Sequence, residues 1–160
     1  MKAGPAHRAT IRAAARQDLP ALHDIAVRSK AHWGYDAEFM ARAAEDLEFR
    51  PEKFQPGFLV FVMESAGRYW GFYGLIPLSA TAIELHDLFV DPEEIGTGLG
   101  KRLWRHAVET AKALGYSRME LTSDPNAEGF YRKMGAVAIG MVGSPVMKGR
   151  RLPRMEFGLD

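Results

Sequence analysis

The sequence contains no cysteine, which excludes disulfide bonds, thiolate-bound zinc and a covalent thiol intermediate. Long hydrophobic runs are also missing. No stretch approaches the roughly 20 apolar residues of a membrane-spanning helix, and the opening segment MKAGPAHRAT lacks the apolar core of a signal peptide. We therefore expect a cytoplasmic protein without a membrane partner.

The sequence also has no marked excess of charge of either sign. It contains 21 Lys and Arg residues and 20 Asp and Glu residues, which gives a net charge of +1. This balance does not favour a nucleic acid as partner, because phosphate backbones are bound by clustered basic residues. No His or carboxylate residues have metal-ligand spacing, so we expect no metal.

The chain has no internal repeat, no low-complexity segment and no linker rich in Pro, Gly or Ser. Its 160 residues match the size of one ordinary domain. We therefore expect a single domain over residues 1–160, present as a monomer or a homodimer.

The spacing of apolar residues predicts strands that dominate the middle of the chain and helices that interrupt them. Strands are predicted over residues 9–14, 57–65, 68–78, 81–90, 117–123, 136–142 and 153–159. Helices are predicted over residues 18–30, 37–47, 99–115 and 126–135, with N-caps at Asp18 and Asp124. The fold class is therefore α/β (α+β), with one mixed sheet and helices on both of its faces.

Local patterns add detail to this expectation. The first helix would bury Leu22, Ile25, Ala26 and Ser29, and the third helix would bury Leu99, Leu103, Ala107, Ala111 and Leu114. Ala66 and Gly67 separate two apolar, β-branched segments, which predicts an antiparallel hairpin.

The segment IGTGLGK, residues 95–101, raises the question of a phosphate site. A Walker loop would need Gly at Ile95 and Ser or Thr at Arg102, and a dinucleotide fingerprint would need Gly at Lys101. What remains is a small-residue turn before a helix N-terminus, where unpaired N–H groups and the helix dipole can bind an anion. A turn that only packs the helix on the sheet is the alternative.

The wider context resembles the GCN5-related N-acetyltransferase family. That family carries [Q/R]-x-x-G-x-[G/A] at the start of this helix and A-x-x-x-Y-x-x-x-G in the helix after the next strand. The corresponding residues here are Ile95, Gly98 and Gly100, then Ala127, Tyr131 and Gly135. The order of elements also resembles that of the family over essentially the whole chain. Ile95 departs from the family pattern, so anion binding would rest on backbone N–H groups.

The resemblance implies the acyl-CoA N-acyltransferase fold, a mostly antiparallel sheet of about seven strands flanked by about four helices. In this fold the central strands splay apart to admit acetyl-CoA as co-substrate. The implied cofactor-binding residues are Leu88, Phe89, Val90, Ile95, Gly96, Thr97, Gly98, Leu99, Gly100, Lys101, Asn126 and Tyr131. Tyr131 also occupies the family position of the general acid that protonates the CoA sulfur.

The general base is expected on the strand over residues 81–90. A period of two places Glu84, His86, Leu88 and Val90 on one face. Glu84 has the spacing of the general base in the histone-acetylating branch of the family, and His86 titrates near neutral pH. Asp87 would point the other way unless a bulge redirects it.

The resemblance implies that two segments bind the amine acceptor. One lies between the first two helices, near His32, Trp33 and Tyr35 with Asp36 beside them, and the other is the loop GSPVMKGRRLP, residues 143–153, between the last two strands. The cluster between the helices would suit an apolar amine with a polar handle, although Trp33 and Tyr35 could instead seal the packing of helix on sheet. The resemblance thus implies an N-acetyltransferase that acts on a small-molecule or peptide amine by direct attack in a ternary complex. A non-catalytic acyl-CoA-binding or regulatory domain is the alternative.

Overall fold

The computed structural model describes residues 5–160. The strands are β1 (Thr10–Ala13), β2 (Leu59–Ser65), β3 (Arg68–Pro77), β4 (Ala82–Val90), β5 (Arg118–Thr122), β6 (Val137–Gly143) and β7 (Arg151–Gly158). The helices are α1 (Leu19–Ala31), α2 (Ala37–Asp46), α3 (Leu99–Ala113) and α4 (Glu128–Lys133). Short 3-10 segments are η1 (Pro5–Arg8), η2 (Arg16–Asp18), η3 (Pro51–Lys53), η4 (Pro92–Glu94) and η5 (Pro125–Ala127).

The seven strands form one sheet in the order β1-β2-β3-β4-β5-β7-β6. Every neighbouring pair is antiparallel except β4 and β5, which run parallel. The predicted mixed, mostly antiparallel sheet with four flanking helices is therefore confirmed. No helix within residues 5–160 has the length and apolar character needed to cross a membrane.

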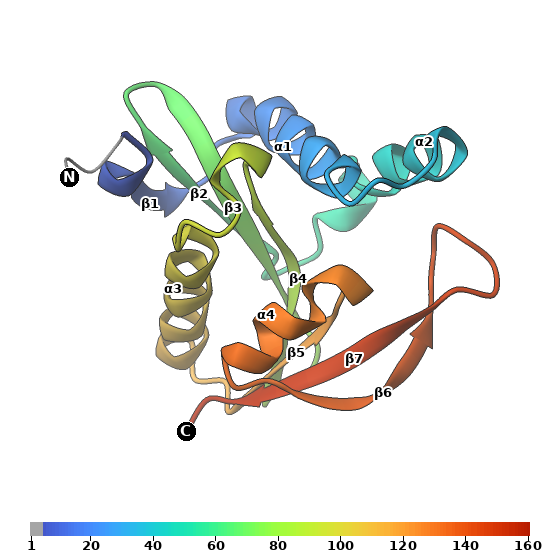
Figure 1. Cartoon of the computed structure of the whole chain (residues 1–160). Helices are drawn as coiled ribbons and strands as arrows, with labels where there is room; N and C mark the ends of the chain where they lie inside the picture. Colours follow the sequence, from blue (N-terminus) through green and yellow to red (C-terminus); the bar gives the residue numbers. More distant parts are fainter. Residues whose placement is uncertain (1–4) are drawn as a thin grey trace.

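The helices cover the two faces of this sheet (Figure 1). On one face α1 packs onto Val62 and Phe72, and the residues it buries are the predicted Leu22, Ile25, Ala26 and Ser29. On the other face α3 packs with α4 over a larger cluster that includes Leu103 and Tyr131. The predicted stripe of α3 holds as far as Ala111, but Leu114 is wrong: it lies at the C-cap and is 51% exposed.

Asp18 does not cap α1 as predicted. Its side chain makes no capping bond to α1 and instead accepts hydrogen bonds from Ala15 N at 2.6 Å and Tyr69 Oη at 2.6 Å. It also forms an ion pair with Arg12, with Nη1 to Oδ2 at 2.8 Å. Of these partners, Arg12 belongs to β1 and Tyr69 to β3, so their bonds to Asp18 attach the start of α1 to the sheet. Asp124 does cap the following turn, since Asn126 N donates to its Oδ1 at 2.8 Å.

The predicted hairpin of β2 and β3 is confirmed, with Ser65 paired to Arg68 across the turn. Both turn residues have positive φ, 52° at Ala66 and 74° at Gly67, which matches the twist of tightly connected strands.

The pairing of β4 with β5 is short. Only residues 82–84 pair with residues 118–120, although β4 continues to Val90. The edge of β4 over residues 85–90 therefore has no strand partner on the β5 side in the described chain. The two strands diverge there, and we call the resulting opening the slot.

Candidate active site

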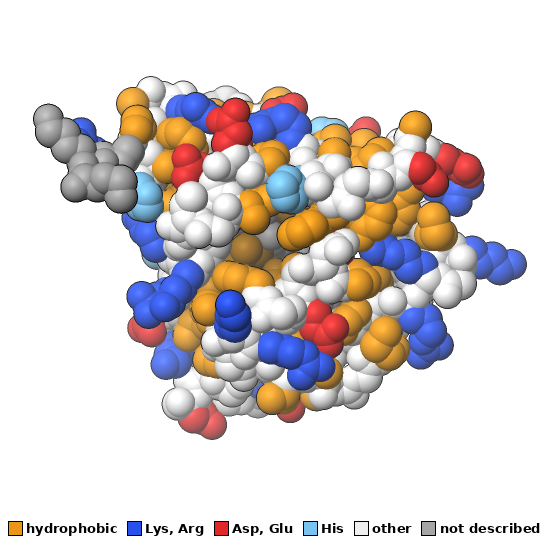
Figure 2. Space-filling model, in the orientation of Figure 1, with side chains coloured by type: hydrophobic (Ala, Val, Ile, Leu, Met, Phe, Trp, Pro, Cys, Tyr) orange, Lys and Arg blue, Asp and Glu red, His pale blue; other side chains and the backbone are white. Residues whose placement is uncertain are grey.

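A cavity of about 620 Å³ follows the slot. Its walls come from α1, β4, the turn before α3, the end of β5, α4 and the hairpin of β6 and β7. Figure 2 shows this face of the molecule hollowed near its centre, with hydrophobic side chains around the hollow. The open edge of β4 thus forms one side of a mainly apolar cavity that opens to solvent.

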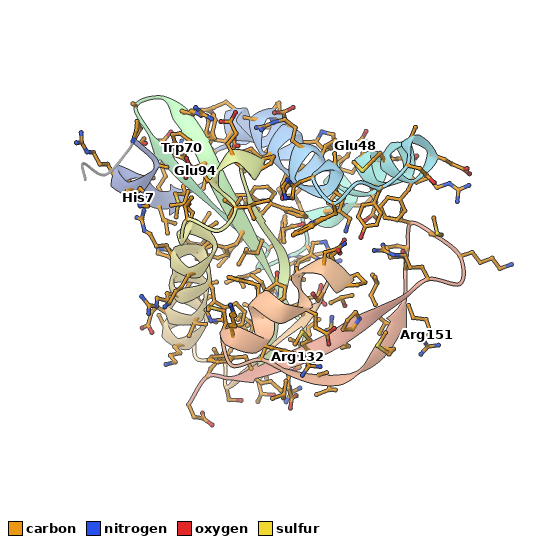
Figure 3. All side chains as sticks on the ribbon, viewed as in Figure 1. His7, Glu48, Trp70, Glu94, Arg132 and Arg151 are labelled. Carbon is orange, nitrogen blue, oxygen red and sulfur yellow. The ribbon has the colours of Figure 1, made fainter. Side chains whose placement is uncertain are left out.

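One end of the cavity lies at the N-terminus of α3. Gly96 and Gly98 have φ values of 86° and 95°, a conformation that an L-residue adopts only with strain. The first helical hydrogen bond here runs from Arg102 N to the Gly98 carbonyl at 3.2 Å. The N–H groups of residues 99–101 therefore have no acceptor within the helix. Figure 3 shows Glu94 in the turn that leads into α3. Backbone N–H groups at a helix N-terminus of this kind can bind an anion.

Most predicted cofactor residues line the cavity: Leu88, Phe89, Val90, Ile95, Gly96, Gly98, Gly100, Lys101, Asn126 and Tyr131. The side chains of the other two residues point elsewhere. Leu99 is fully buried in the core, and the hydroxyl of Thr97 donates to the Glu94 carbonyl at 2.7 Å. Leu99 and Thr97 can therefore offer only backbone groups to a ligand.

A bulge in β4 changes the predicted assignment of faces. Gly74 pairs with Asp87 but Leu75 pairs with Leu85, so His86 is the extra residue. Ile83, Leu85, Leu88 and Val90 belong to the cluster on the α3 face, whereas Phe89 packs on the α1 face. The prediction that Glu84, His86, Leu88 and Val90 share one face is therefore wrong.

Glu84 and Asp87 instead share the α1 face. Their partners on β3 are Ile76 and Gly74, which lie on the same face of that strand as Phe72, and Phe72 packs on the α1 side. A single inserted residue thus brings a second carboxylate to the slot. Sequence reasoning named this possibility for Asp87 but could not locate the bulge.

Both oxygens of Glu84 are engaged. Oε1 lies 2.8 Å from Nδ1 of His86, and Oε2 accepts a hydrogen bond from Nη1 of Arg154 at 3.0 Å. The hydrogen bond with His86, followed by Arg154, lowers the pKa of Glu84 although burial opposes the shift. The same contact with Glu84 raises the pKa of His86. Glu84 is therefore a weak proton acceptor in this arrangement.

Asp87 has the opposite character. Its carboxylate is half-buried and accepts no side-chain or backbone hydrogen bond from residues 5–160. Burial raises the pKa of Asp87, while the nearby charges of His86 and Lys53 act in the other direction. A carboxylate held above its usual pKa and facing a cavity is suited to accepting a proton.

Tyr131 lines the cavity from α4 and is 8% exposed. Burial raises its pKa, and the charges of Asp87 and Asp124 raise it further. The phenol is therefore protonated at neutral pH, and within the described residues its hydroxyl has no hydrogen-bond partner. It is available to donate a proton or a hydrogen bond into the cavity.

The predicted acceptor cluster does not form one surface. Trp33 lines the cavity, and His32 lies against it edge-on at 5.0 Å between ring centroids. The hydroxyl of Tyr35 is occupied by Asp124, whose Oδ2 accepts from it at 2.8 Å. Asp36 caps α2, since its Oδ1 accepts from Phe39 N at 2.8 Å.

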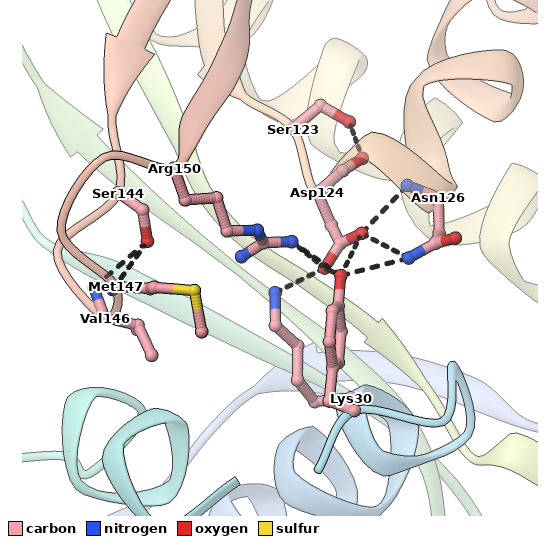
Figure 4. A network of polar contacts seen from close by, with 9 residues as sticks. Lys30, Ser123, Asp124, Asn126, Ser144, Val146, Met147 and Arg150 are labelled. Atoms are coloured by element: carbon pink, nitrogen blue, oxygen red, sulfur yellow. Dashed lines mark hydrogen bonds and ion pairs between the residues drawn. The ribbon is translucent and has the colours of Figure 1, made fainter. Parts of the chain in front are cut away.

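Sequence reasoning missed a polar network beside the cavity, which is lined by three of its members, Lys30, Asp124 and Asn126 (Figure 4). Lys30 Nζ lies 2.6 Å from Oδ2 of Asp124, and Nη2 of Arg150 donates to Tyr35 Oη at 2.6 Å. Nδ2 of Asn126 also donates to Tyr35 Oη at 3.0 Å. Its members come from segments far apart in the sequence, and only the capping role of Asp124 has a local signal.

Within residues 5–160, no group of three His, Asp or Glu side chains could hold a metal ion.

The chain is similar to known proteins both in sequence and in fold. A model of the acetyltransferase (GNAT) family matches residues 15–136. No curated protein sequence gives a significant match.

Among solved structures, the chain is similar to a GCN5-related N-acetyltransferase from Rhodopseudomonas palustris. The TM-score is 0.77 at 21% identity, with 94% of this chain and 95% of that chain covered. The ribosomal-protein-S18-alanine N-acetyltransferase from Escherichia coli matches with a TM-score of 0.70 at 19% identity, covering 94% of each chain. An aminoglycoside 6'-N-acetyltransferase complexed with coenzyme A matches with a TM-score of 0.69 at 18% identity, covering 94% of this chain and 97% of that chain. At these identities the likeness concerns the fold.

Proposed function

The chain belongs to the acetyltransferase (GNAT) family, and from this premise we propose that it transfers the acetyl group of acetyl-CoA to a primary amine. The observation that carries the proposal is the slot, which leads from a backbone anion site at α3 to a free carboxylate and a protonated phenol. The CoA bound to the structurally similar aminoglycoside acetyltransferase supports the choice of co-substrate.

The residues present fit acetyl-CoA. Its pyrophosphate would bind the N–H groups of the turn around Gly96 and Gly98, with Lys101 at the rim. Its pantetheine arm would lie along the open edge of β4, where the backbone of residues 88–90 has no β5 partner. Neither contact needs the Gln or Arg side chain that Ile95 replaces.

We propose that Asp87 takes the proton from the attacking ammonium group. The amine nitrogen then attacks the carbonyl carbon of the acetyl group, whose oxygen a backbone N–H near Phe89 would stabilise. Glu84 and His86 stay as alternative bases, but the ion pair of Glu84 with Arg154 makes Glu84 less suited than Asp87.

Tyr131 would complete the transfer. As the carbon–nitrogen bond forms and the carbon–sulfur bond breaks, the phenol gives its proton to the leaving sulfur. The nitrogen loses a second proton as the amide forms, and this proton passes through solvent to the Tyr131 phenolate. The first proton leaves Asp87 for bulk solvent, so both side chains return to their starting charges and one proton is released overall. A direct transfer of this kind needs no cysteine, in agreement with the sequence.

The proposal is tested by the release of free CoA thiol in the presence of a panel of amines. Tyr131→Phe should bind acetyl-CoA as the wild type does, measured by calorimetry, and lose about 10²-fold in kcat. Tyr116→Phe is a matched control, because Tyr116 is partly buried against the core cluster and does not line the cavity. Binding of acetyl-CoA without turnover of any amine would favour a non-catalytic acyl-CoA-binding domain instead.

A further inference from the structure

The glycine turn over residues 95–98, which would bind the pyrophosphate, has little packing of its own. Its four residues are exposed, and a Cβ atom at Gly96 or Gly98 would meet no atom within 4 Å. A segment of this kind keeps one conformation only if its ends are fixed. Leu99, which is fully buried, fixes the end toward α3. The approach to the other end begins at Asp91, which is 2% exposed and has no part in the proposed acetyl transfer.

Asp91 contacts three elements at the point where β4 ends and η4 begins. Its N–H donates to the Trp70 carbonyl on β3 at 2.8 Å, and its Oδ1 accepts from Glu93 N in η4 at 3.0 Å. Its Oδ2 accepts from Nη2 of Arg28, which comes from α1, at 3.2 Å. Nη2 of Arg68 on β3 lies 3.7 Å from the same oxygen. Asp91 thus attaches the start of η4 to β3 and to α1, beside which η4 lies (Figure 1).

Two consecutive hydrogen-bonded turns connect Asp91 to the glycine turn. Glu94 N donates to the Asp91 carbonyl at 2.8 Å, and Thr97 N donates to the Glu94 carbonyl at 3.2 Å. The hydroxyl of Thr97 donates to the same carbonyl at 2.7 Å. The chain from Asp91 to Gly98 is therefore held by bonds to its own backbone, and Asp91 is its buried polar end.

The carboxylate of Asp91 is a strong acceptor. Burial opposes ionisation, but the bond from Glu93 N and the ion pair with Arg28 hold the pKa of Asp91 below its usual value. The group is therefore ionised at neutral pH, and a charged acceptor binds an N–H more strongly than a neutral one does. Neither Asp91 nor Arg28 lines the cavity, so any effect of these residues on a ligand passes through η4.

We propose that Asp91 is a positioning residue, which holds the glycine turn in the conformation that binds the pyrophosphate of acetyl-CoA. The identity of this ligand rests on the proposed acetyl transfer. In the wild type the turn is already formed, whereas without Asp91 the ligand would have to order an exposed segment, which lowers affinity. Once the ligand is bound, the turn is formed again, so the rate of the chemical step should not depend on Asp91.

Calorimetry with CoA tests this role without an amine. Asp91→Ala removes both the acceptor for Glu93 N and the partner of Arg28, and should weaken CoA binding about tenfold. Asp91→Asn keeps an acceptor suited to an N-cap but loses the ion pair, and should weaken binding only about threefold. Arg28→Met should also weaken it about threefold. Asp24→Ala is the matched control and should leave the affinity unchanged, because Asp24 binds the same guanidinium at 2.8 Å from within α1.

Kinetics separate positioning from a general loss of structure. In Asp91→Ala the KM for acetyl-CoA should rise about tenfold, while kcat at saturating acetyl-CoA should stay within about twofold of the wild type. Unchanged CoA affinity in Asp91→Ala, an equal loss in Asp24→Ala, or a tenfold fall in kcat at unchanged KM would overturn the inference. If Asp91→Ala does not fold, Arg28→Met decides, and unchanged affinity in that variant would overturn it.

The same measurements keep this inference apart from the proposed function. Binding of CoA that depends on Asp91, without turnover of any amine, would support the positioning role and overturn acetyl transfer. Turnover of an amine by a folded Asp91→Ala with the KM of the wild type would do the reverse. Failure of the wild type to bind CoA would overturn both.

Discussion

Gly74 offers a way to move the proposed base without changing its chemistry. A Cβ atom at Gly74 would lie 2.9 Å from Oδ2 of Asp87 and 3.3 Å from the ring of Phe58. The carboxylate oxygen is the end of a side chain, so Gly74→Ala should displace it by about 0.5 Å to reach an ordinary contact distance. Gly74→Ala therefore moves the carboxylate of Asp87 without removing it.

The expected effect follows from this displacement. A catalytic group misplaced by about 1 Å can reduce the rate about 10²-fold, so a shift of about half that distance predicts a loss of about tenfold in kcat. The free energy of unfolding should change by less than about 1 kcal/mol, because a methyl group in a strand offsets part of the strain. Release of CoA thiol measures the first quantity, and urea denaturation measures the second.

The pH profile gives an independent readout. Burial raises the pKa of Asp87, and the carboxylate must be ionised to accept a proton, so activity should fall as the pH drops through this raised pKa. Asp87→Asn should remove that acid limb and lower kcat by about 10²-fold or more, whereas Glu84→Gln should keep the limb. Gly158→Ala serves as the control for Gly74→Ala, because its Cβ would meet no atom within 4 Å. Unchanged kcat in Gly74→Ala together with a retained acid limb in Asp87→Asn would refute the reasoning.

Two other substitutions test features away from the proposed base. Gly98→Ala puts an L-residue at a φ of 95°, which costs about 1–2 kcal/mol and should weaken acetyl-CoA binding about tenfold in calorimetry. Gly129→Ala is the control and should leave acetyl-CoA binding unchanged, because Gly129 has no positive φ and its Cβ would meet no atom within 4 Å. Asp18→Asn should lower the free energy of unfolding by about 2 kcal/mol at neutral pH. Because Arg12 holds the pKa of Asp18 below its usual range, this difference is present above the unfolded pKa of about 3.9 and disappears as the pH falls through the folded pKa. An equal difference at pH values where Asp18 is protonated in both states would contradict that origin.

Sequence patterns predicted the elements well because burial follows helical and strand periods. The four residues that α1 buries were predicted from spacing alone. The cap at Asp18 failed because Arg12 and Tyr69, which come from other elements, bind its carboxylate more effectively than the helix end does. Local preference cannot reveal such competition.

The site was harder to predict for similar reasons. Nothing in the segment ELHDLFV marks His86 as an inserted residue, because the bulge exists only through the pairing of β4 with β3. The polar network beside the cavity joins Tyr35 to Arg150 and Lys30 to Asp124, pairs separated by 115 and 94 residues. The family motifs placed Tyr131 and the glycine turn beside the cavity, but the chemical roles of Tyr131, Glu84 and His86 stay predictions.

The short pairing of β4 with β5 leaves the sheet open to stabilisation by a ligand. In residues 5–160, backbone contacts between β4 and β5 are confined to residues 81–84 and 117–120. A ligand lying along the open edge would therefore replace missing strand contacts. A ligand that binds only the folded chain adds about 2.7 kcal/mol of stability at 100 times its Kd. The cellular level of acetyl-CoA would then set the protein's resistance to unfolding and degradation, and a cell short of this metabolite would hold fewer intact copies of the enzyme.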